Sequence, residues 1–276
     1  MTDSFSRGGL SDMAALSFGP YELVRPLRHA SHAERYLAVQ PERLTNHVAY
    51  RVTLDDTAEA RQLFLDAIDS AAAVTSPHAL PIEQFSMTSP IEAWVISPFV
   101  GDHDGLLLLS DLLGDKGGML EPAEVRRAVG QLLEAADAGA QRGLPHGPLG
   151  IDDVQVDRRG SIRIELYGLR AAADPSGRDA DDLHQDEVRD IIAIGYELLT
   201  GIRPQSASID PKRLVPSAPD DLCALLRSAL DSEPTFATAR EALEALAAPA
   251  AGAPQIEVRV RTGRRGFGFA KRRSNA

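Results

Sequence analysis

Residues 146 to 168 bring together several side chains of this chain that are suited to chemistry. His146 is followed by Asp153, and an alternating apolar stretch then leads to Glu165. The Asp153 carboxylate could bind a magnesium ion, although one carboxylate completed by waters makes a weak site. Pro148 and Leu166 lie in the same segment and have no ionisable group. The segment therefore has the layout of a reaction site but few of the groups that a reaction needs.

Lysine, the usual partner of a phosphate group, is scarce in this chain. The first 115 residues contain no lysine, and the three in the whole chain are Lys116, Lys212 and Lys271. Arg51 lies in the strand-like run 48–54, but its planar guanidinium is larger than an ammonium group and is aimed differently. Any chemistry that needs a lysine in the first third of the chain therefore has no candidate.

The elements that must position these residues change in type along the chain. Short β-branched or aromatic runs, separated by polar residues, predict an antiparallel sheet with strands at 21–27, 35–39, 48–54, 82–87 and 93–100. Apolar residues at helical spacing predict helices at 57–74, 106–113, 122–141, 188–200, 219–230 and 238–247. A strand-rich first third and a helical remainder predict an α+β protein with two lobes.

This order of elements, together with its motifs, resembles a Hanks-type serine/threonine protein kinase domain of the bacterial kind. The family's catalytic loop reads His-Arg-Asp, with an Asn five residues after the Asp, and its metal-binding turn reads Asp-Phe-Gly. The matching residues here are His146-Gly147-Pro148 with Asp153, and Leu166-Tyr167-Gly168. The segment 190–204, which starts at Asp190 and exits through Gly201 and Pro204, resembles the family's long buried helix of the C-lobe.

The resemblance covers residues 20–248 and implies a division of the chain. We expect an N-lobe at 20–100 with a five-stranded antiparallel sheet and one helix, and a mostly helical C-lobe at 101–248. Residues 1–19 are rich in Ser, Gly and Asp, and we expect them to be disordered. Residues 249–276 form a linker and a basic tail.

The resemblance also implies that the reacting groups are replaced. Pro148 takes the place of the catalytic base, Leu166 that of a metal-binding Asp, Asp153 that of an Asn, and Arg51 that of the lysine in Val-Ala-Ile-Lys. The glutamate that pairs with this lysine falls on Ala67, so we expect Arg51 to be unpaired or bound to another carboxylate. Loss of the general base alone costs on the order of 10² to 10⁴ in rate. We therefore expect that the protein has no enzyme activity and is a degenerate kinase, or pseudokinase.

Two further segments depart from the family. The three positions of the phosphate-covering Gly-rich turn fall on Arg28, Ala30 and Ala33, where added Cβ atoms crowd a bound phosphate. The Ala-Pro-Glu anchor of the activation segment has no counterpart, and residues 179–187 are predicted to be a solvated acidic loop. Glu165, next to Leu166 in an extended stretch, should point to the opposite face and so does not replace the missing Asp.

Nucleotide binding without catalysis stays open. The candidate binding residues are Arg51, Ser97, Phe99 and Asp153. Phe99 is included because Pro98, at the predicted hinge, would leave the Phe99 amide free for adenine. No cofactor or metal is expected, and ATP without metal is the one ligand that the resemblance leaves open. Four residues match the family's framework positions rather than its reacting ones, namely His146, Tyr167, Gly168 and Asp190. The resemblance implies that Asp190 starts a helix and accepts hydrogen bonds from the backbone of the catalytic loop.

Charge is divided unevenly along the chain. Residues 255–276 carry a net charge of +6 within a total of −11, which leaves −17 for residues 1–254. This tail suits loose phosphate binding and base stacking through Arg259, Arg261, Arg264, Arg265, Phe267, Phe269, Lys271, Arg272 and Arg273. An intramolecular clasp or a protein-docking tail is the preferred interpretation, and nucleic-acid binding is the alternative.

Composition sets the remaining limits. The single cysteine, Cys223, lies among leucines at helical spacing and excludes internal disulfides. No apolar run reaches the roughly 18 residues of a membrane helix, and residues 1–19 lack the order of a signal peptide. We expect a cytoplasmic regulatory or scaffolding protein whose partner is another protein, such as an active kinase or another signalling protein. The alternatives are a weak nucleotide binder or atypical kinase, and a nucleic-acid-associated protein.

Overall fold

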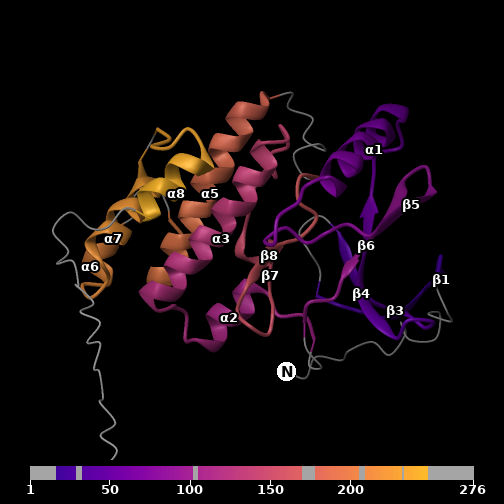
Figure 1. The fold of residues 1–276 in the computed structure, drawn as a ribbon, viewed down its shortest axis with the longest axis horizontal. Coiled ribbons are helices and arrows are strands. Elements are labelled where there is room, and N and C mark those ends of the chain that lie inside the picture. The colour runs from indigo at the N-terminus through magenta and orange to yellow at the C-terminus, as the bar shows by residue number, and fades with distance from the viewer. Residues whose placement is uncertain are drawn as a thin grey trace, which may run out of the picture.

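A computed structural model describes residues 17–28, 33–101, 105–169, 178–204, 209–231 and 233–247. It forms two lobes, a strand-rich one and a helical one, which lie side by side in Figure 1. Residue 30, residues 1–16 and the basic tail lie outside the described residues, so the predictions made for them remain predictions.

A single antiparallel sheet in the order β1-β2-β3-β4-β6-β5 builds the N-lobe. Its strands are β1 (Ser17–Phe18), β2 (Tyr21–Pro26), β3 (Glu34–Gln40), β4 (Thr45–Thr53), β5 (Gln84–Ser89) and β6 (Glu92–Pro98). The five expected strands are all present, and β1 is an additional one inside the segment that was expected to be disordered. Phe18 explains it, because its ring is buried and lies 6.1 Å from the ring of Trp94.

The sheet packs one face against α1 (Ala58–Ala72) and the C-lobe. Thr57 caps this helix by accepting a hydrogen bond from the backbone of Ala60, and Phe64 and Ile68 on its buried face belong to the same apolar core as Tyr50. This core continues from the N-lobe into the C-lobe, so apolar packing also joins the lobes.

The C-lobe is built around two long helices, α3 (Pro122–Ala140) and α5 (Ala180–Thr200), which pack against each other (Figure 1). Around them lie α2 (Leu109–Asp115), α6 (Pro211–Leu214), α7 (Asp220–Arg227), α8 (Ala239–Ala247) and the 3₁₀ turns η1 (Ile151–Asp153) and η2 (Ser228–Leu230). The prediction of a loop at 179–187 was wrong: α5 starts at Ala180, eight residues before the expected start, because Asp179 caps it there by accepting from the Asp181 amide.

A short hairpin of β7 (Val154–Val156) and β8 (Ile162–Ile164) lies where the lobes meet (Figure 1). The backbone of β8 bonds to the segment that follows α1: the Leu80 amide donates to Ile164 and the Ile164 amide donates to His78, each at 2.8 Å. The N-lobe is therefore attached to the C-lobe by backbone hydrogen bonds as well as by the shared core.

Two general expectations can be compared with the described part of the chain. Cys223 is buried and unpaired, as expected of a small core residue. None of the helices described is long and apolar enough to cross a membrane.

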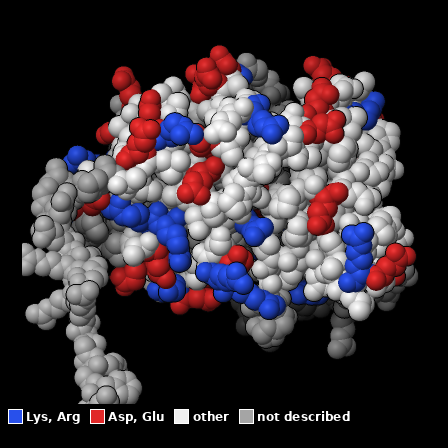
Figure 2. Space-filling model, in the orientation of Figure 1, with Lys and Arg blue, Asp and Glu red and all other residues white. Residues whose placement is uncertain are grey.

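On the face shown in Figure 2, acidic and basic side chains are interspersed, with acidic ones prominent along the upper edge.

Candidate functional site

The resemblance places the candidate residues between the two lobes, in a region that we call the cleft. The Arg51 side chain does not point into this region. Arg51 is paired instead with two N-lobe carboxylates, at 2.7 Å from Nε to Glu92 and 3.3 Å from Nη1 to Glu34. Side chains alternate along β4, so Arg51 faces the outer side of the sheet while Tyr50 faces the cleft. Ala67 is buried in α1. Of the two expectations for Arg51, pairing with another carboxylate is the one that the structure shows.

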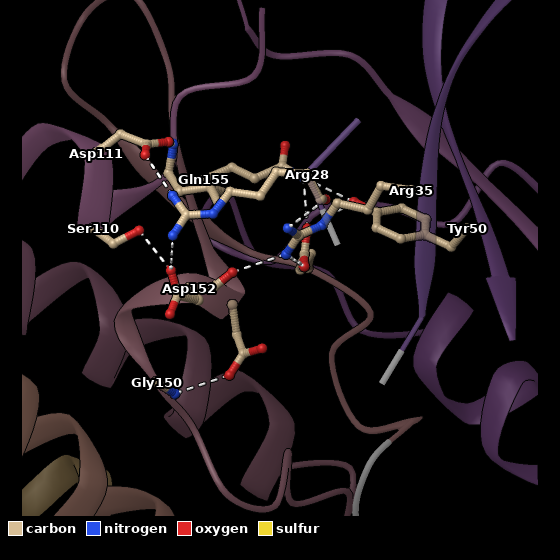
Figure 3. A network of polar contacts seen from close by, with 11 residues as sticks. Arg28, Arg35, Tyr50, Ser110, Asp111, Gly150, Asp152 and Gln155 are labelled. Atoms are coloured by element: carbon tan, nitrogen blue, oxygen red, sulfur yellow. Dashed lines mark hydrogen bonds and ion pairs between the residues drawn. The ribbon is translucent and has the colours of Figure 1, made fainter. Parts of the chain in front are cut away.

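Four buried polar side chains occupy the centre of the cleft instead. Arg35 of β3 lies directly across from Tyr50 of β4, and its Nε donates to Glu165 at 3.1 Å while Nη2 also contacts this carboxylate. The Tyr50 hydroxyl donates to Glu165 at 3.0 Å, and the Gln155 amide donates to both at 2.8 Å. Relative exposure is 1% for Arg35 and 0% for the other three. We refer to these four residues as the cleft cluster, of which Figure 3 labels Arg35, Tyr50 and Gln155.

Burial dominates the electrostatics of the cleft cluster. It raises the pKa of the Glu165 carboxyl above its ordinary value, although the Arg35 guanidinium and the hydrogen bonds oppose this shift. Burial likewise raises the pKa of Tyr50 well above its usual range, and the neighbouring Glu165 charge raises it further. Tyr50 therefore remains protonated and can act as a hydrogen-bond donor to Glu165.

A second, outer group of charges lies beside the cleft cluster and also joins the lobes. Arg28 at the end of β2 contacts Asp111 at 2.6 Å and Asp152 at 3.5 Å, and Ser110 donates to Asp152 at 2.6 Å (Figure 3). The Arg35 Nη2 donates to the carbonyl of Asp152 at 2.8 Å, so Asp152 contacts both the cleft cluster and the outer group of charges. The position expected to carry a glycine over the phosphates thus carries an ion pair.

The residues predicted to replace the family's base and metal ligands differ in their surroundings. Pro148 is exposed, at the rim of an open pocket of about 410 Å³. Leu166, which the resemblance assigns to a metal-ligand position, is fully buried and has a left-handed backbone with a φ of 47°. Asp153 is nearly buried, and its Oδ2 accepts a hydrogen bond from the Gly150 amide at 3.0 Å. No cluster of three or more metal-ligating side chains occurs among residues that the structure describes.

The hinge differs from the prediction. The Phe99 amide donates to the carbonyl of Asn46 at 3.2 Å, so the expectation that it would be free for adenine was wrong. The reason is that β4 starts at Thr45, three residues earlier than expected, and extends alongside the end of β6. Ser97 is fully buried opposite Val48, and its hydroxyl has no hydrogen-bond partner within the described chain.

Three of the four framework residues are in contact with one another. The rings of His146 and Tyr167 stack at 5.2 Å, and the Gly168 amide donates to His146 Nδ1 at 3.2 Å. The Leu149 amide donates to Asp190 at 3.1 Å, which is the loop contact expected of that aspartate, although Asp190 lies in the middle of α5 and not at its start.

Glu187 completes this framework and was missed. Its buried carboxylate accepts from the His146 amide at 3.1 Å and from the Tyr167 hydroxyl at 2.6 Å. The Tyr167 pKa is raised well above its usual range, by burial first and then by the Glu187 charge. The spacing of three residues between Glu187 and Asp190 on one helix is the signal that could have suggested a shared face.

The cleft cluster was missed for a similar reason. Glu165 was expected only to point away from the Leu166 side, Arg35 was predicted as an ordinary strand residue, and no role was predicted for Gln155. The available signal was Gln155, a polar residue between Val154 and Val156. Polar groups in buried strands need partners.

Comparison with known proteins identifies the fold. No family model matches the chain, and no curated protein matches it. Among solved structures, the kinase domain of Mycobacterium tuberculosis PknI superposes with a TM-score of 0.66 and 21% sequence identity. The match covers 84% of this chain and 97% of that domain. The chain therefore has the two-lobed fold of a protein kinase domain.

Proposed function

We propose that this protein is a pseudokinase, a kinase-fold protein that transfers no phosphate and acts as a regulatory or scaffolding module for another protein. The observation that carries the proposal is the cleft cluster. In the kinase fold the nucleotide lies between the lobes, against the strand that carries the lysine and under the Gly-rich turn. Here Arg35, Tyr50, Gln155 and Glu165 contact one another between the lobes and are closed to solvent, which supports the proposal that no nucleotide binds there.

The chemistry of the surrounding positions supports the same proposal. Neither Pro148 nor Leu166 has a group that could accept a proton or bind magnesium. Arg51 is bound to Glu92 and Glu34 on the outer face of the sheet, so its charge is not directed toward a phosphate in the cleft. Positioning and charge stabilisation supply almost all of the catalysis in phosphoryl transfer, and both are reduced here.

Binding of ATP without metal is less well supported. An adenine ring would have to compete with Asn46 for the Phe99 amide, and the Asp153 carboxylate already accepts from its own loop. Nucleic-acid binding depends on tail residues that lie outside the described chain.

A scaffolding role is supported by the framework residues, whose hydrogen bonds are intact. Glu187 contacts His146 and Tyr167, and Asp190 contacts the Leu149 amide. These hydrogen bonds keep the predicted catalytic loop, the predicted metal turn and α5 together. A fold that keeps this framework while its cleft is filled can act through its surface. Function resides in sites placed on a fold, and we propose that the site here is a surface that binds another protein.

The proposal is tested by nucleotide binding and phosphate transfer. Thermal unfolding is followed with ATP alone, with ATP and Mg²⁺, and with ATP and Mn²⁺, and transfer of labelled γ-phosphate to the protein itself and to a basic protein substrate is measured in parallel. We expect no shift of the unfolding midpoint and no incorporated label, since a ligand that does not bind the native state cannot stabilise it. A metal-dependent shift of several degrees, or label incorporated above background, overturns the proposal.

A matched variant tests the reason for the lack of binding. Arg35→Val/Glu165→Ala removes both charges together, so neither is left uncompensated, and it opens space in the cleft. We expect ATP to stabilise this variant while the wild type stays unaffected. If the folded variant also fails to bind ATP, the cleft cluster is not what prevents binding.

A further inference from the structure

We infer that the Arg35–Glu165 pair is an inter-lobe lock, which holds the two lobes in one closed arrangement without any bound ligand. This goes beyond the proposed function, because a filled cleft does not by itself require that the lobes be immobile. The lock would make the N-lobe and C-lobe a single rigid unit with a composite surface.

The two charges of the lock come from different lobes. Arg35 lies in β3 and Glu165 directly follows β8, 130 positions later in the chain. Both side chains are 0% exposed. Opening the cleft would break this ion pair together with the hydrogen bonds from Tyr50 to Glu165 and from Arg35 to the Asp152 carbonyl.

Additional hydrogen bonds fix the geometry of the lock. Tyr50 and Gln155, again one from each lobe, both donate to Glu165 Oε2, and Arg35 also donates to the Asp152 carbonyl. A buried pair is favourable when its remaining donors and acceptors are satisfied in this way. The bonds from Leu80 and to His78 already attach the N-lobe to β8, so the lock adds a second attachment.

The outer contacts of Arg28 are not the lock. The side chains of Arg28 and Asp111 are 58% and 36% exposed, and exposed ion pairs of this kind are screened by salt and contribute little. The buried layer should therefore hold the lobes together at high ionic strength as well as at low.

Hydrogen–deuterium exchange of the folded full-length protein tests this inference. In wild-type protein, peptides covering 34–40 and 154–164 should be as well protected as those from α3 and α5. In Glu165→Gln, Arg35 is left as a buried charge that reaches water most readily when the cleft opens. We expect exchange about tenfold or more faster in 34–40 and 154–164, and within about twofold of wild type in α3 and α5.

Arg51→Gln is the matched control, because it removes an arginine whose ion pairs stay within the N-lobe. It should leave exchange in 154–164 unchanged. Equal acceleration of every peptide in Glu165→Gln, or no acceleration at the cleft, overturns the inference. If Glu165→Gln does not fold, the wild type decides: cleft peptides that exchange tenfold faster than those of α3 also overturn it.

Discussion

At the centre of the cleft, the hydroxyl of Tyr50 joins polar groups from both lobes. It donates to Glu165 and accepts from Gln155, and it is completely buried. Hydrogen bonds to charged groups in such surroundings contribute more than exposed ones, because the unpaired partner cannot turn to water.

Replacing Tyr50 by Phe tests this energetic difference. Tyr50→Phe should lower the free energy of unfolding by about 1–3 kcal/mol, since Glu165 loses a donor and Gln155 an acceptor. Tyr36→Phe is the matched control, because the Tyr36 hydroxyl donates to the half-exposed Glu34, and it should change stability by less than about 0.5 kcal/mol. Chemical denaturation measures both, and equal losses would contradict the prediction.

Glu92 provides a pH-dependent signal on the outer face of the sheet. The Thr88 hydroxyl, then the Trp94 indole and Arg51, stabilise its carboxylate and lower its pKa below the ordinary 4.5. Below pH about 4.5 the unfolded chain binds this proton more readily than the folded protein. The stability that Glu92 contributes is therefore present above that pH and is lost as pH falls through the lowered folded pKa.

Trp94 makes this titration visible, because it is the single tryptophan of the chain and donates to Glu92 at 3.0 Å. Its fluorescence should change with a midpoint below pH 4.5, while far-UV circular dichroism shows that the protein remains folded. Glu92→Gln should abolish the change. A midpoint at or above 4.5 would show that the carboxylate is not stabilised.

At the scale of elements, close packing of α3 against α5 depends on Gly195. A Cβ atom added there would lie 2.5 Å from Val129 and 2.7 Å from Leu226. The helix at this point is fully buried, so neither neighbour can move into solvent. Packing at this position therefore outweighs the weak helix propensity of glycine.

Gly195→Ala should consequently destabilise the protein by about 1–3 kcal/mol, although alanine is the better helix former. Gly130→Ala in α3 is the control, since its added Cβ would meet only Leu246 at 3.5 Å, an ordinary contact. We expect it to be neutral or to stabilise by up to about 1 kcal/mol. Thermal denaturation compares the two, and a stable Gly195→Ala protein would disprove the packing argument.

At the scale of the whole molecule, we expect the residues at positions 51, 148 and 166 and the cleft cluster to be independent obstacles to phosphate transfer. Restoring the family's residues with Arg51→Lys, Pro148→Asp and Leu166→Asp together should therefore give no phosphate transfer above the wild type. The cleft cluster would still fill the space between the lobes, and residue 51 would still point to the outer face of the sheet.

Transfer of labelled phosphate to a basic protein substrate with Mg²⁺ measures this outcome. Leu166→Asp places a charge in a buried position, so circular dichroism and Trp94 emission must first show that the triple variant is folded. A gain of about a hundredfold over the wild type would mean that the cleft accepts ATP despite the cluster.

The order of the elements, and the positions that lack an ionisable group, could be predicted from the sequence alone. Strand and helix periods are local properties, so α1 was predicted within two residues of its observed bounds, and β2 within one. The identities of Pro148 and Leu166 need no structure to show that they lack an ionisable group. The framework contact of Asp190 with the loop backbone also followed from its place in the motif.

The partners of the polar side chains could not be predicted in this way and became apparent only in the folded protein. Arg35 and Glu165, Phe99 and Asn46, and His146 and Glu187 are pairs that lie far apart in sequence. Period-two and helical patterns indicate which face a residue occupies, but they do not identify what lies opposite that face. Burial then makes such pairings obligatory, because a polar group shielded from water must be satisfied within the protein.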